Sequence, residues 1–423
     1  MPYVVRDRVA GFKRVRLLIA LGVLGLAGIA GVFLYSALTA ASSHFNGWVY
    51  LESNRATAGN NSVMAYRVDD GKPRLAHEYS TGGTGVVDPG GIGALDADQQ
   101  ITFDRERRLL FAVNQGSDSV AVFRVGRDGR LTPAPGSPFK TRGKAPGSVG
   151  VVGDFAVVAD KAHDPARALD FARAFYDVFR IQADGSLRPV GKPFALRAGS
   201  SPIGALPLTE RLLVATEETG PFRTLLVGQN GSLFQGSNSP LRPEPSLFRQ
   251  GYEGVRWSIG LVRAPNRDLH LLYMNTPQIA KLLVYSWDES GRLTYVTSAD
   301  NDGAKLPCWT TITPNGRYLY TANAANGSVS AFSLGSDRRS PKQIQRLQLE
   351  RGGNPWAIQV DPSGKTVFVV DARAASFLRK GLGNRLHVLA VKGGGRLEEV
   401  ETVKVPVGTD ASLLGIAVVP DGS

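Results

Sequence analysis

Cysteine is nearly absent from this chain of 423 residues, because Cys308 is the only one. A single thiol excludes an intramolecular disulfide, so an exported domain of this sequence must be stabilised by its hydrophobic core. The five histidines are scattered singly, and CxxC pairs, HExxH, P-loop and G-x-S-x-G motifs are missing. These absences argue against a histidine- or cysteine-built metal centre and against a serine nucleophile on a sharp turn. We therefore expect neither a metal nor a cofactor.

Long uncharged stretches are also lacking, apart from residues 17–43. A run of that length can cross a hydrocarbon core of about 30 Å as a helix. Residues 1–16 carry five basic side chains against one acid, and such a cationic flank stays in the cytoplasm. The pattern predicts a basic cytoplasmic leader at 1–16, a transmembrane anchor or uncleaved signal at 17–43, and a domain on the extracytoplasmic (periplasmic or extracellular) side. Small residues at 39–41 leave cleavage as the alternative.

Positive charge predominates, with a formal net charge of +12. A third of that excess lies in the leader, and the remainder is spread over the rest of the chain without a basic tract interleaved with aromatic residues. We therefore expect no nucleic-acid partner. An acidic surface of the cell envelope suits this diffuse charge better.

What the sequence does contain is an internal repeat with a period of about 45–60 residues. Its clearest copies are residues 100–133 and 309–334. Each copy has an apolar strand, a tight turn rich in Pro, Asp, Asn and Gly, a second apolar strand with a polar end, and a third alternating strand. The second strands are expected at 47–51, 109–113, 155–159, 212–215, 269–274, 318–321 and 367–370.

Both ends of the repeat region are strand-like. Residues 47–51 have no first strand before them, and residues 414–419 have no second strand after them. Pairing of these two segments completes one blade and removes the open edges of the array. The sequence thus predicts an all-β fold over 47–423, a seven-bladed β-propeller of four-stranded antiparallel blades whose C-terminal strand joins the N-terminal blade. Because a closed ring leaves no edge that demands pairing, we expect a monomer.

Two insertions and two tryptophans add detail to this prediction. Residues 165–176 and 372–383 have helical character and are expected on turns between second and third strands, on the face that carries the blade connections. Trp309 and Trp356 occupy equivalent points of successive repeats, which favours packing between blades over a platform for stacking carbohydrate.

Three segments point to a family. They are NQGSDSVAVFRV, the following DGRLTPAPGSPF, and TPNGRYLYTANAANGSVSAF. Their pattern resembles the lactonase-type seven-bladed propellers, which include bacterial propeller 6-phosphogluconolactonases and fungal carboxymuconate cyclases. The likeness extends over about residues 47–423 and is clearest in the second and sixth blades. Because propellers of many functions share such turns, it specifies architecture better than chemistry.

The resemblance implies an active centre on the face that carries the blade connections. In the family it uses a histidine before a first strand, a glutamate at the end of the second strand of blade four, and arginines near blades four and five. Glu217 falls on the glutamate position. The histidine and arginine positions are occupied here by residues 146–148, 202–204 and Thr276, so most of the family's centre is not matched.

Glu217 therefore needs other partners if it is catalytic. Opening of a lactone requires a group that activates water and a cation that receives the developing oxyanion. His163 and Arg256, on neighbouring loops, are the candidate substitutes. The alternative interpretation makes His163 a surface residue beside a helix cap at Asp164, and Arg256 a cation on the rim.

One polar residue recurs at the end of every second strand: Asn54, Asn114, Asp160, Glu217, Asn275, Asn323 and Asp371. As a functional feature they would form a ring at the channel mouth that binds a polar ligand or a hard cation such as calcium. The candidate ligand-binding members are Asn114, Asp160, Asn275, Asn323 and Asp371. The alternative is turn chemistry, since Asn and Asp bond the backbone of such turns. Glu217 is the member that turn chemistry explains least.

Two functions follow from these observations. The first is an exported, membrane-anchored hydrolase of a lactone or cyclic ester with Glu217 as base or electrostatic centre. The second is a non-catalytic propeller that binds a protein, glycan or small ligand of the cell envelope on its loop face. The surroundings of Glu217 distinguish them, because a hydrolase requires this carboxylate in a pocket with a cation in reach.

Overall fold

The computed structural model describes residues 45–86, 96–164, 167, 173–218, 220–248, 256–372, 382–408 and 410–422. Residues 44–423 form one compact unit. The predicted leader at 1–16 and the predicted transmembrane segment at 17–43 lie outside the described residues. Within those residues, no helix has the length and apolar character that a membrane span requires.

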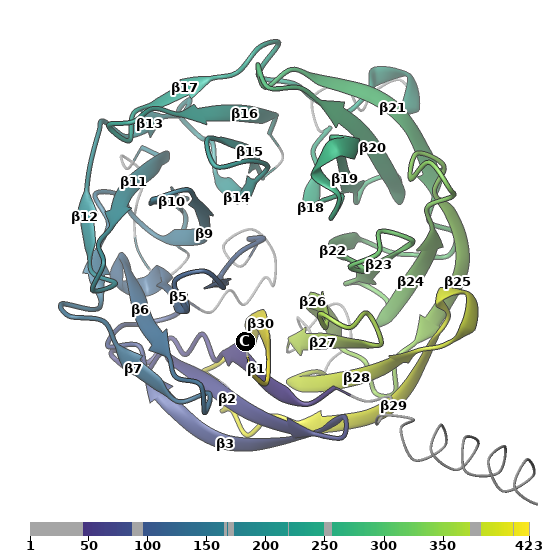
Figure 1. The fold of residues 1–423 in the computed structure, drawn as a ribbon, viewed down its shortest axis with the longest axis horizontal. Coiled ribbons are helices and arrows are strands. Elements are labelled where there is room, and N and C mark those ends of the chain that lie inside the picture. The colour runs from purple at the N-terminus through teal and green to yellow at the C-terminus, as the bar shows by residue number, and fades with distance from the viewer. Residues whose placement is uncertain are drawn as a thin grey trace, which may run out of the picture. The chain divides into compact units, whose positions relative to one another are not determined.

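Seven antiparallel sheets form a ring (Figure 1). Blade one contains β30 (Leu414–Pro420), β1 (Gly47–Glu52), β2 (Ser62–Asp69) and β3 (Lys72–Ser80). Blade two contains β4 (Ile101–Asp104), β5 (Leu109–Asn114), β6 (Ser119–Val125) and β7 (Leu131–Pro133), with β8 (Phe139–Lys140) beside β6. Blade three contains β9 (Pro146–Val152), β10 (Phe155–Asp160), β11 (Phe175–Ile181) and β12 (Leu187–Pro189), with β13 (Phe194–Ala195) beside β11.

The remaining four blades each have four strands in chain order. Blade four contains β14 (Pro202–Pro207), β15 (Leu212–Glu217), β16 (Phe222–Val227) and β17 (Leu233–Gln235). Blade five contains β18 (Ile259–Arg263), β19 (Leu271–Thr276), β20 (Lys281–Trp287) and β21 (Leu293–Asp300). Blade six contains β22 (Pro307–Ile312), β23 (Tyr318–Asn323), β24 (Ser328–Ser333) and β25 (Lys342–Gln348). Blade seven contains β26 (Asn354–Val360), β27 (Thr366–Ala372), β28 (Arg385–Val391) and β29 (Leu397–Lys404). Short 3-10 helices lie at η1 (Gln115–Ser117), η2 (Pro245–Leu247), η3 (Arg267–Leu269) and η4 (Gly393–Gly395).

The seven-bladed architecture and all seven second strands are confirmed. One boundary was wrong, because Leu269 belongs to η3 and the strand begins at Leu271. Asn266 caps η3 by accepting a hydrogen bond from the amide of Asp268, so the chain turns once more before it extends. Of the predicted helical insertion at 165–176, residues 175 and 176 start β11, and most of the rest lies outside the described residues.

The ring closes between the two ends of the propeller. β1 pairs with β2 on one side and with β30 on the other, with Trp48 opposite Val419 and Leu51 opposite Ile416. The predicted closure is therefore confirmed. The last strand of the chain thus serves as the first strand of blade one, so all seven blades have their four strands.

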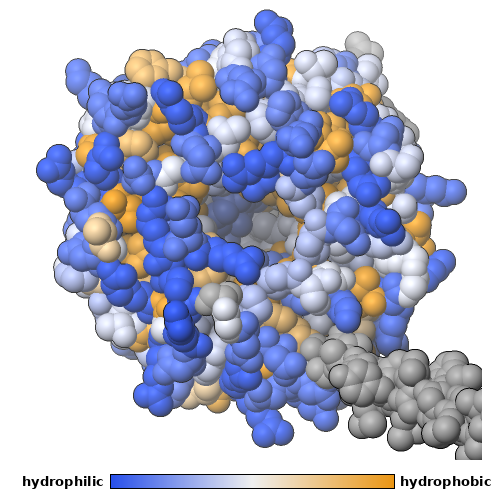
Figure 2. Space-filling model, viewed as in Figure 1, coloured by the Kyte–Doolittle hydropathy of each residue, from blue (hydrophilic) through white to orange (hydrophobic). Residues whose placement is uncertain are grey.

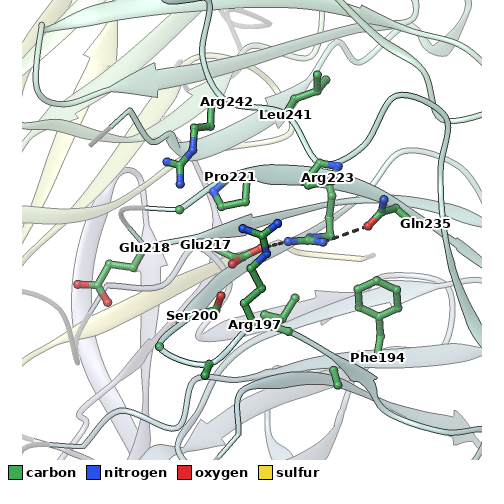
Figure 3. Close-up of a pocket in the computed structure, with 16 residues that line it drawn as sticks. Phe194, Arg197, Ser200, Glu217, Glu218, Pro221, Arg223, Gln235, Leu241 and Arg242 are labelled. Carbon is green, nitrogen blue, oxygen red and sulfur yellow. Dashed lines mark hydrogen bonds and ion pairs between the residues drawn. The ribbon is translucent and has the colours of Figure 1, made fainter. Parts of the chain in front are cut away.

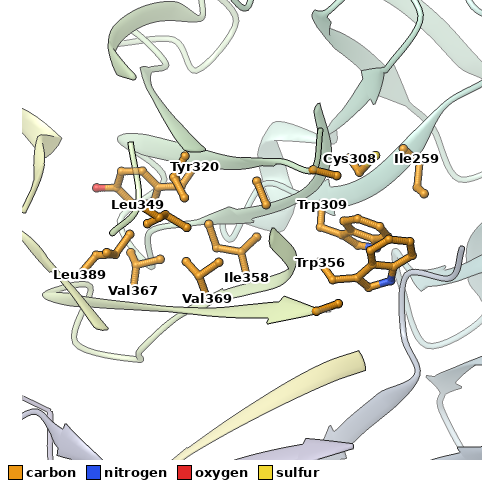
Figure 4. Packing of buried hydrophobic residues seen from close by; sticks show 14 of the residues in the cluster. Ile259, Cys308, Trp309, Tyr320, Leu349, Trp356, Ile358, Val367, Val369 and Leu389 are labelled. Carbon is orange, nitrogen blue, oxygen red and sulfur yellow. The ribbon is translucent and has the colours of Figure 1, made fainter. Parts of the chain in front are cut away.

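The core lies between adjacent blades. Second strands such as β5 and β15 are buried at every residue, because both faces of each sheet pack against neighbouring blades. Outer strands such as β25 alternate between exposed and half-buried residues. Trp309 and Trp356 are buried between blades six and seven with ring centroids 4.4 Å apart, which confirms packing between blades (Figure 4).

Residues 96–99, the last described part of the connection from blade one to blade two, bond to the inner strands of several blades. The amide of Asp98 donates to the carbonyl of Ile203 (2.7 Å), and Trp309 Nε1 donates to the carbonyl of Ala97 (2.8 Å). Asp98 also accepts a bond from the amide of Gly260 (3.0 Å). The segment thereby links blades four, five and six. Beside it lies a channel cavity of about 230 Å³, and hydrophilic side chains surround a central hollow on the face seen in Figure 2.

Candidate functional site

A cavity of about 620 Å³ lies where blades three and four meet, on the face that carries the turns between second and third strands. Blade three supplies Phe194 and the connection that follows β13. Blade four supplies Glu217 and Glu218 from the end of β15, Arg223 from β16 and Gln235 from β17. Figure 3 shows Glu217, Arg223 and Gln235 close together. The cavity therefore includes the one predicted catalytic residue that the resemblance indicates.

Glu217 lies at the base of this cavity and is only 2% exposed. Its Oε1 accepts a hydrogen bond from Arg223 Nη2, and the two form a buried ion pair. Arg223 Nη1 donates to Gln235 Oε1 at 3.1 Å, and the guanidinium carbon lies 5.8 Å from the ring centroid of Phe194. A charge-assisted bond of this kind holds both groups in one orientation. The carboxylate is thus fixed with a cation in reach.

The local backbone explains why the pair forms. In the antiparallel register of β15 and β16, Ala215 lies opposite Arg223, so the side chain of Arg223 lies next to the strand end at Glu217. The turn between the strands is tight, with the amide of Glu217 donating to the carbonyl of Pro221 (3.1 Å). A Cβ on Gly220 would lie 2.7 Å from the Cβ of Glu217, so this turn requires glycine there.

Glu218 also lines the cavity but has different neighbours. Its side chain points away from Arg223 in Figure 3. His163 Nδ1 lies 3.8 Å from its Oε2. Burial alone would raise the pKa of Glu218, but a hydrogen bond from His163 and the charge of Lys161 lower it below its usual value. The carboxyl group of Glu218 is therefore held in its charged form.

The two other predicted catalytic residues are not brought to Glu217. His163 adjoins Glu218 instead, and of the described residues neither His163 nor Arg256 lines the cavity. Arg256 Nη1 donates to the carbonyl of Pro243 at 3.0 Å, and Arg242 Nη1 donates to the carbonyl of Arg256 at the same distance. Arg256 thus fastens the loop that carries Arg242. A catalytic role for these two residues stays a prediction without direct geometric support.

Sequence reasoning missed the cations that do line the cavity. Arg223 is the partner of Glu217, and Arg197 and Arg242 lie on the wall nearer solvent (Figure 3). Arg223 had a signal, since it is a lone charge inside the apolar strand FRTLLV. The two others lie in connections whose paths depend on contacts between blades, and no local pattern marks them.

The predicted ring of polar residues is almost completely buried. Asn114, Asp160, Asn275, Asn323 and Asp371 have no exposed surface. Asn114 accepts bonds from Asn61 Nδ2 (2.9 Å) and Thr81 Oγ1 (2.6 Å), and Asn275 Nδ2 donates to the carbonyl of Cys308 (2.7 Å). In these blades the bonds run to neighbouring segments and not to the backbone of the turn. Such burial favours a structural role, and ligand binding by these residues stays a prediction.

The two acids of that ring differ in electrostatics. Burial, and then the charge of Asp177, raise the pKa of Asp160 well above its usual range. Asp371 Oδ2 accepts a bond from the amide of Gly353 (2.6 Å) and lies 3.3 Å from His387 Nε2. Among the described residues, no three His, Cys, Asp or Glu side chains are placed to hold a metal ion.

Comparison with known proteins finds a family that part of this chain resembles. The model described as "Lactonase, 7-bladed beta-propeller" matches residues 264–409. Over these residues the predicted resemblance to the lactonase-type propellers is confirmed. The match includes most of blade five and all of blades six and seven, so the cavity at Glu217 lies outside the matched residues. No match was found among curated proteins.

Solved structures share the fold at low identity. A periplasmic gluconolactonase from Pseudomonas aeruginosa has a TM-score of 0.66 and 17% identity, with 88% of this chain and 99% of that chain covered. A proposed 6-phosphogluconolactonase from Bacteroides fragilis has a TM-score of 0.65 and 15% identity, with 88% and 98% covered. A hypothetical selenium-binding protein from Sulfolobus tokodaii has a TM-score of 0.61 and 10% identity, with 88% and 94% covered. These likenesses show the fold alone.

Proposed function

We propose that the protein hydrolyses a lactone or related cyclic ester in the cavity at Glu217. The observation that carries this proposal is the buried ion pair of Glu217 and Arg223 at the base of a cavity of about 620 Å³. A carboxylate in a pocket with a cation in reach is the arrangement that a hydrolase requires. The resemblance to the lactonase-type propellers and the gluconolactonase among the similar structures support the same chemistry.

The reaction assigns a role to each group. Glu217 accepts a proton from a water molecule as that water attacks the carbonyl carbon of the lactone. Arg223 holds the carboxylate in place, and Arg197 or Arg242 stabilises the negative charge that develops on the carbonyl oxygen. The ring C–O bond then breaks, and the alkoxide that leaves takes up the proton, which gives a hydroxy acid.

The second candidate is a non-catalytic propeller that binds a ligand in the same cavity. It is favoured by the engagement of Glu217 with Arg223, because a carboxylate that already accepts a strong bond from a guanidinium is a weaker proton acceptor. On this alternative the arginines would bind an anionic ligand or an envelope partner without turnover. Both candidate functions use the same cavity, and they differ in whether the bound molecule is hydrolysed.

The location is part of the proposal. The uncharged segment 17–43 and the basic leader before it support a membrane anchor with the propeller on the periplasmic or extracellular side. We propose a monomer, anchored in this way, whose substrate is available outside the cytoplasm. A protease added to intact spheroplasts should digest the propeller, and protection of the propeller would contradict this orientation.

A panel of lactones tests the activity. Full-length protein is compared with Glu217→Gln and with a matched control, Glu289→Gln, which removes an exposed carboxyl group that does not line the cavity. Loss of a general base should lower kcat/KM by about 10²-fold or more in Glu217→Gln. The control should equal the wild type. Buffer-level rates in all three proteins, with ligand binding retained, would favour the binding module instead.

A further inference from the structure

A second cavity of about 620 Å³ opens at the other end of β15. Glu217 ends this strand, whereas the second cavity is lined by residues 206–210, which precede the strand. Most of the rest of the lining comes from the ends of β4 and β9 and from the turns that follow β4 and β18, and Gln99 and Gln359 complete it. The cavity therefore lies on the face opposite the candidate active site and does not belong to it.

Arginines form one side of this second cavity. Arg263 and Arg267 both line it, and Arg263 is half-buried; its Nη1 donates to the carbonyl of Ala264 (3.3 Å). Burial lowers the pKa of Arg263 and repulsion from Arg267 lowers it further, while the charge of Glu210 offsets only part of this decrease. Two like charges held together in this way are destabilising unless an anion lies between them.

The acids in the same lining do not neutralise these arginines. Asp104 is bonded to Arg107 at 3.0 Å. Glu210 lies 3.4 Å from Arg267, but both side chains are more than half exposed, and such a surface pair contributes little. Arg263 is therefore a half-buried cation of the cavity that forms no ion pair with a carboxylate among the described residues.

Apolar side chains also line the cavity. Phe103, Val151, Leu206 and Pro207 line the cavity, and all four are half-buried, so part of each side chain remains open to it. They come from the first strands of three successive blades, two, three and four. The cavity thus combines an apolar wall with a cationic edge, a lining suited to a ligand that is amphipathic.

We propose that this second cavity binds an organic anion whose apolar body lies against Phe103, Val151 and Leu206 and whose charged head contacts Arg263 and Arg267. The guanidinium groups donate charge-assisted hydrogen bonds to the head, which is a carboxylate or a phosphate. The apolar wall contributes by removal of surface from water. This site is independent of lactone hydrolysis, because its residues lie at the opposite end of blade four.

Small water-soluble probes test the proposal on the full-length protein. Phenylacetate and phenylphosphonate each carry an apolar ring, with a carboxylate head in the first and a phosphonate head in the second. Phenylacetamide has the ring without the charge, and inorganic phosphate has the charge without the ring. Isothermal titration should show binding of at least one of the two organic anions. The amide and inorganic phosphate should bind at least about tenfold more weakly, since each loses one of the two contributions.

Variants assign the binding to this cavity. Arg263→Gln should weaken the organic anion about tenfold or more, and Arg263→Lys should retain part of the affinity. Arg267→Gln, at an exposed position, provides the same test if Arg263→Gln does not fold. Arg211→Gln, on the turn between β14 and β15 but outside the lining, should bind as the wild type does. Equal binding of phenylacetamide, an unchanged affinity in both Arg263→Gln and Arg267→Gln, or a loss confined to Arg242→Gln would overturn the proposal.

Discussion

Blades four and seven place a charged pair at the same point of the fold and use it differently. Glu217 and Asp371 each end a second strand, and Arg223 and His387 lie at the equivalent register on the third strand, opposite the residue two positions earlier. In blade four the pair lines a cavity. In blade seven His387 is enclosed by Asp371 and by Glu399 on the outer strand, with Nδ1 2.6 Å from Glu399 Oε1.

The comparison shows that strand register brings the two charged side chains of each pair together. The segments around each pair determine whether it is enclosed or lines a cavity. Glu399 and Thr402 cover the blade-seven cluster, so the whole of His387 is buried. In blade four the outer strand β17 ends early at Gln235, and the space above the pair stays open as the cavity. A buried cluster specifies structure, whereas a pair on a cavity is available for chemistry.

The largest effect is expected in blade seven. His387→Leu removes the cation from between two carboxylates and leaves Asp371 and Glu399 buried without it. Removal of one partner of a buried pair lowers the free energy of unfolding by about 3–5 kcal/mol. Chemical denaturation of the variant measures this loss. A decrease below about 1 kcal/mol would contradict a structural role for the cluster.

A smaller loss of stability is expected in blade four. Arg223→Gln leaves Glu217 without its ion pair, but the cavity allows water to solvate the carboxylate. We expect a loss of about 1–3 kcal/mol in the free energy of unfolding together with a decrease in lactone turnover of about 10²-fold. Denaturation and steady-state kinetics measure the two separately. Full activity in this variant would show that Glu217 does not need the guanidinium.

The pH dependence of stability sharpens the contrast. Burial alone would lower the pKa of His387, but its bonds with Asp371 and Glu399 raise it above its ordinary value. The stabilisation is therefore fully present below the unfolded pKa of about 6.5 and is lost as the pH rises through the folded pKa. The slope cannot exceed about 1.4 kcal/mol per pH unit for one proton.

Glu399 acts at the acid end of the range. Burial would raise its pKa, but the bonds from His387 and Thr402 lower it, so its contribution is lost as the pH falls through the folded pKa. The unfolding free energy of the wild type, measured from pH 4 to 9, should thus decrease toward both the acid and the alkaline end of the range. His387→Gln should flatten the decrease on the alkaline side; an unchanged profile would contradict the assignment.

The smallest effect on stability is expected at the cavity mouth. Arg197 is exposed, so Arg197→Gln should change the free energy of unfolding by no more than about 0.5 kcal/mol. If Arg197 binds the substrate or the developing charge, kcat/KM should still fall severalfold. Thermal unfolding and kinetics on one preparation measure both. A variant with unaltered kinetics would remove Arg197 from the proposed site.

Much of the fold was predictable from the sequence, because the repeat is local. Each second strand is an apolar run with a polar end, and the unmatched strands at the two ends, 47–51 and 414–419, predicted the closure. The bonding of residues 96–99 to several blades was not predicted. The bonds to Ile203 and Gly260 join segments far apart in sequence, and no local pattern marks them.

The candidate site was predicted only in part. Glu217 was found from its place at a strand end, but its partner was assigned to His163 or Arg256, which lie on loops. The actual partner, Arg223, follows from strand register, since a third-strand residue comes beside the end of the second strand. A search for a charge at that register would have identified Arg223 and also His387.

One paired measurement tests the central claim that equivalent strand ends have different roles. Glu217→Gln and Asp371→Asn make the same chemical change in blades four and seven. Stability and lactone turnover are measured for both variants beside the wild type. We expect Glu217→Gln to lose turnover and keep most of its stability, and Asp371→Asn to lose stability and, where folded, keep its turnover. Equal losses of both properties in the two variants would contradict the account.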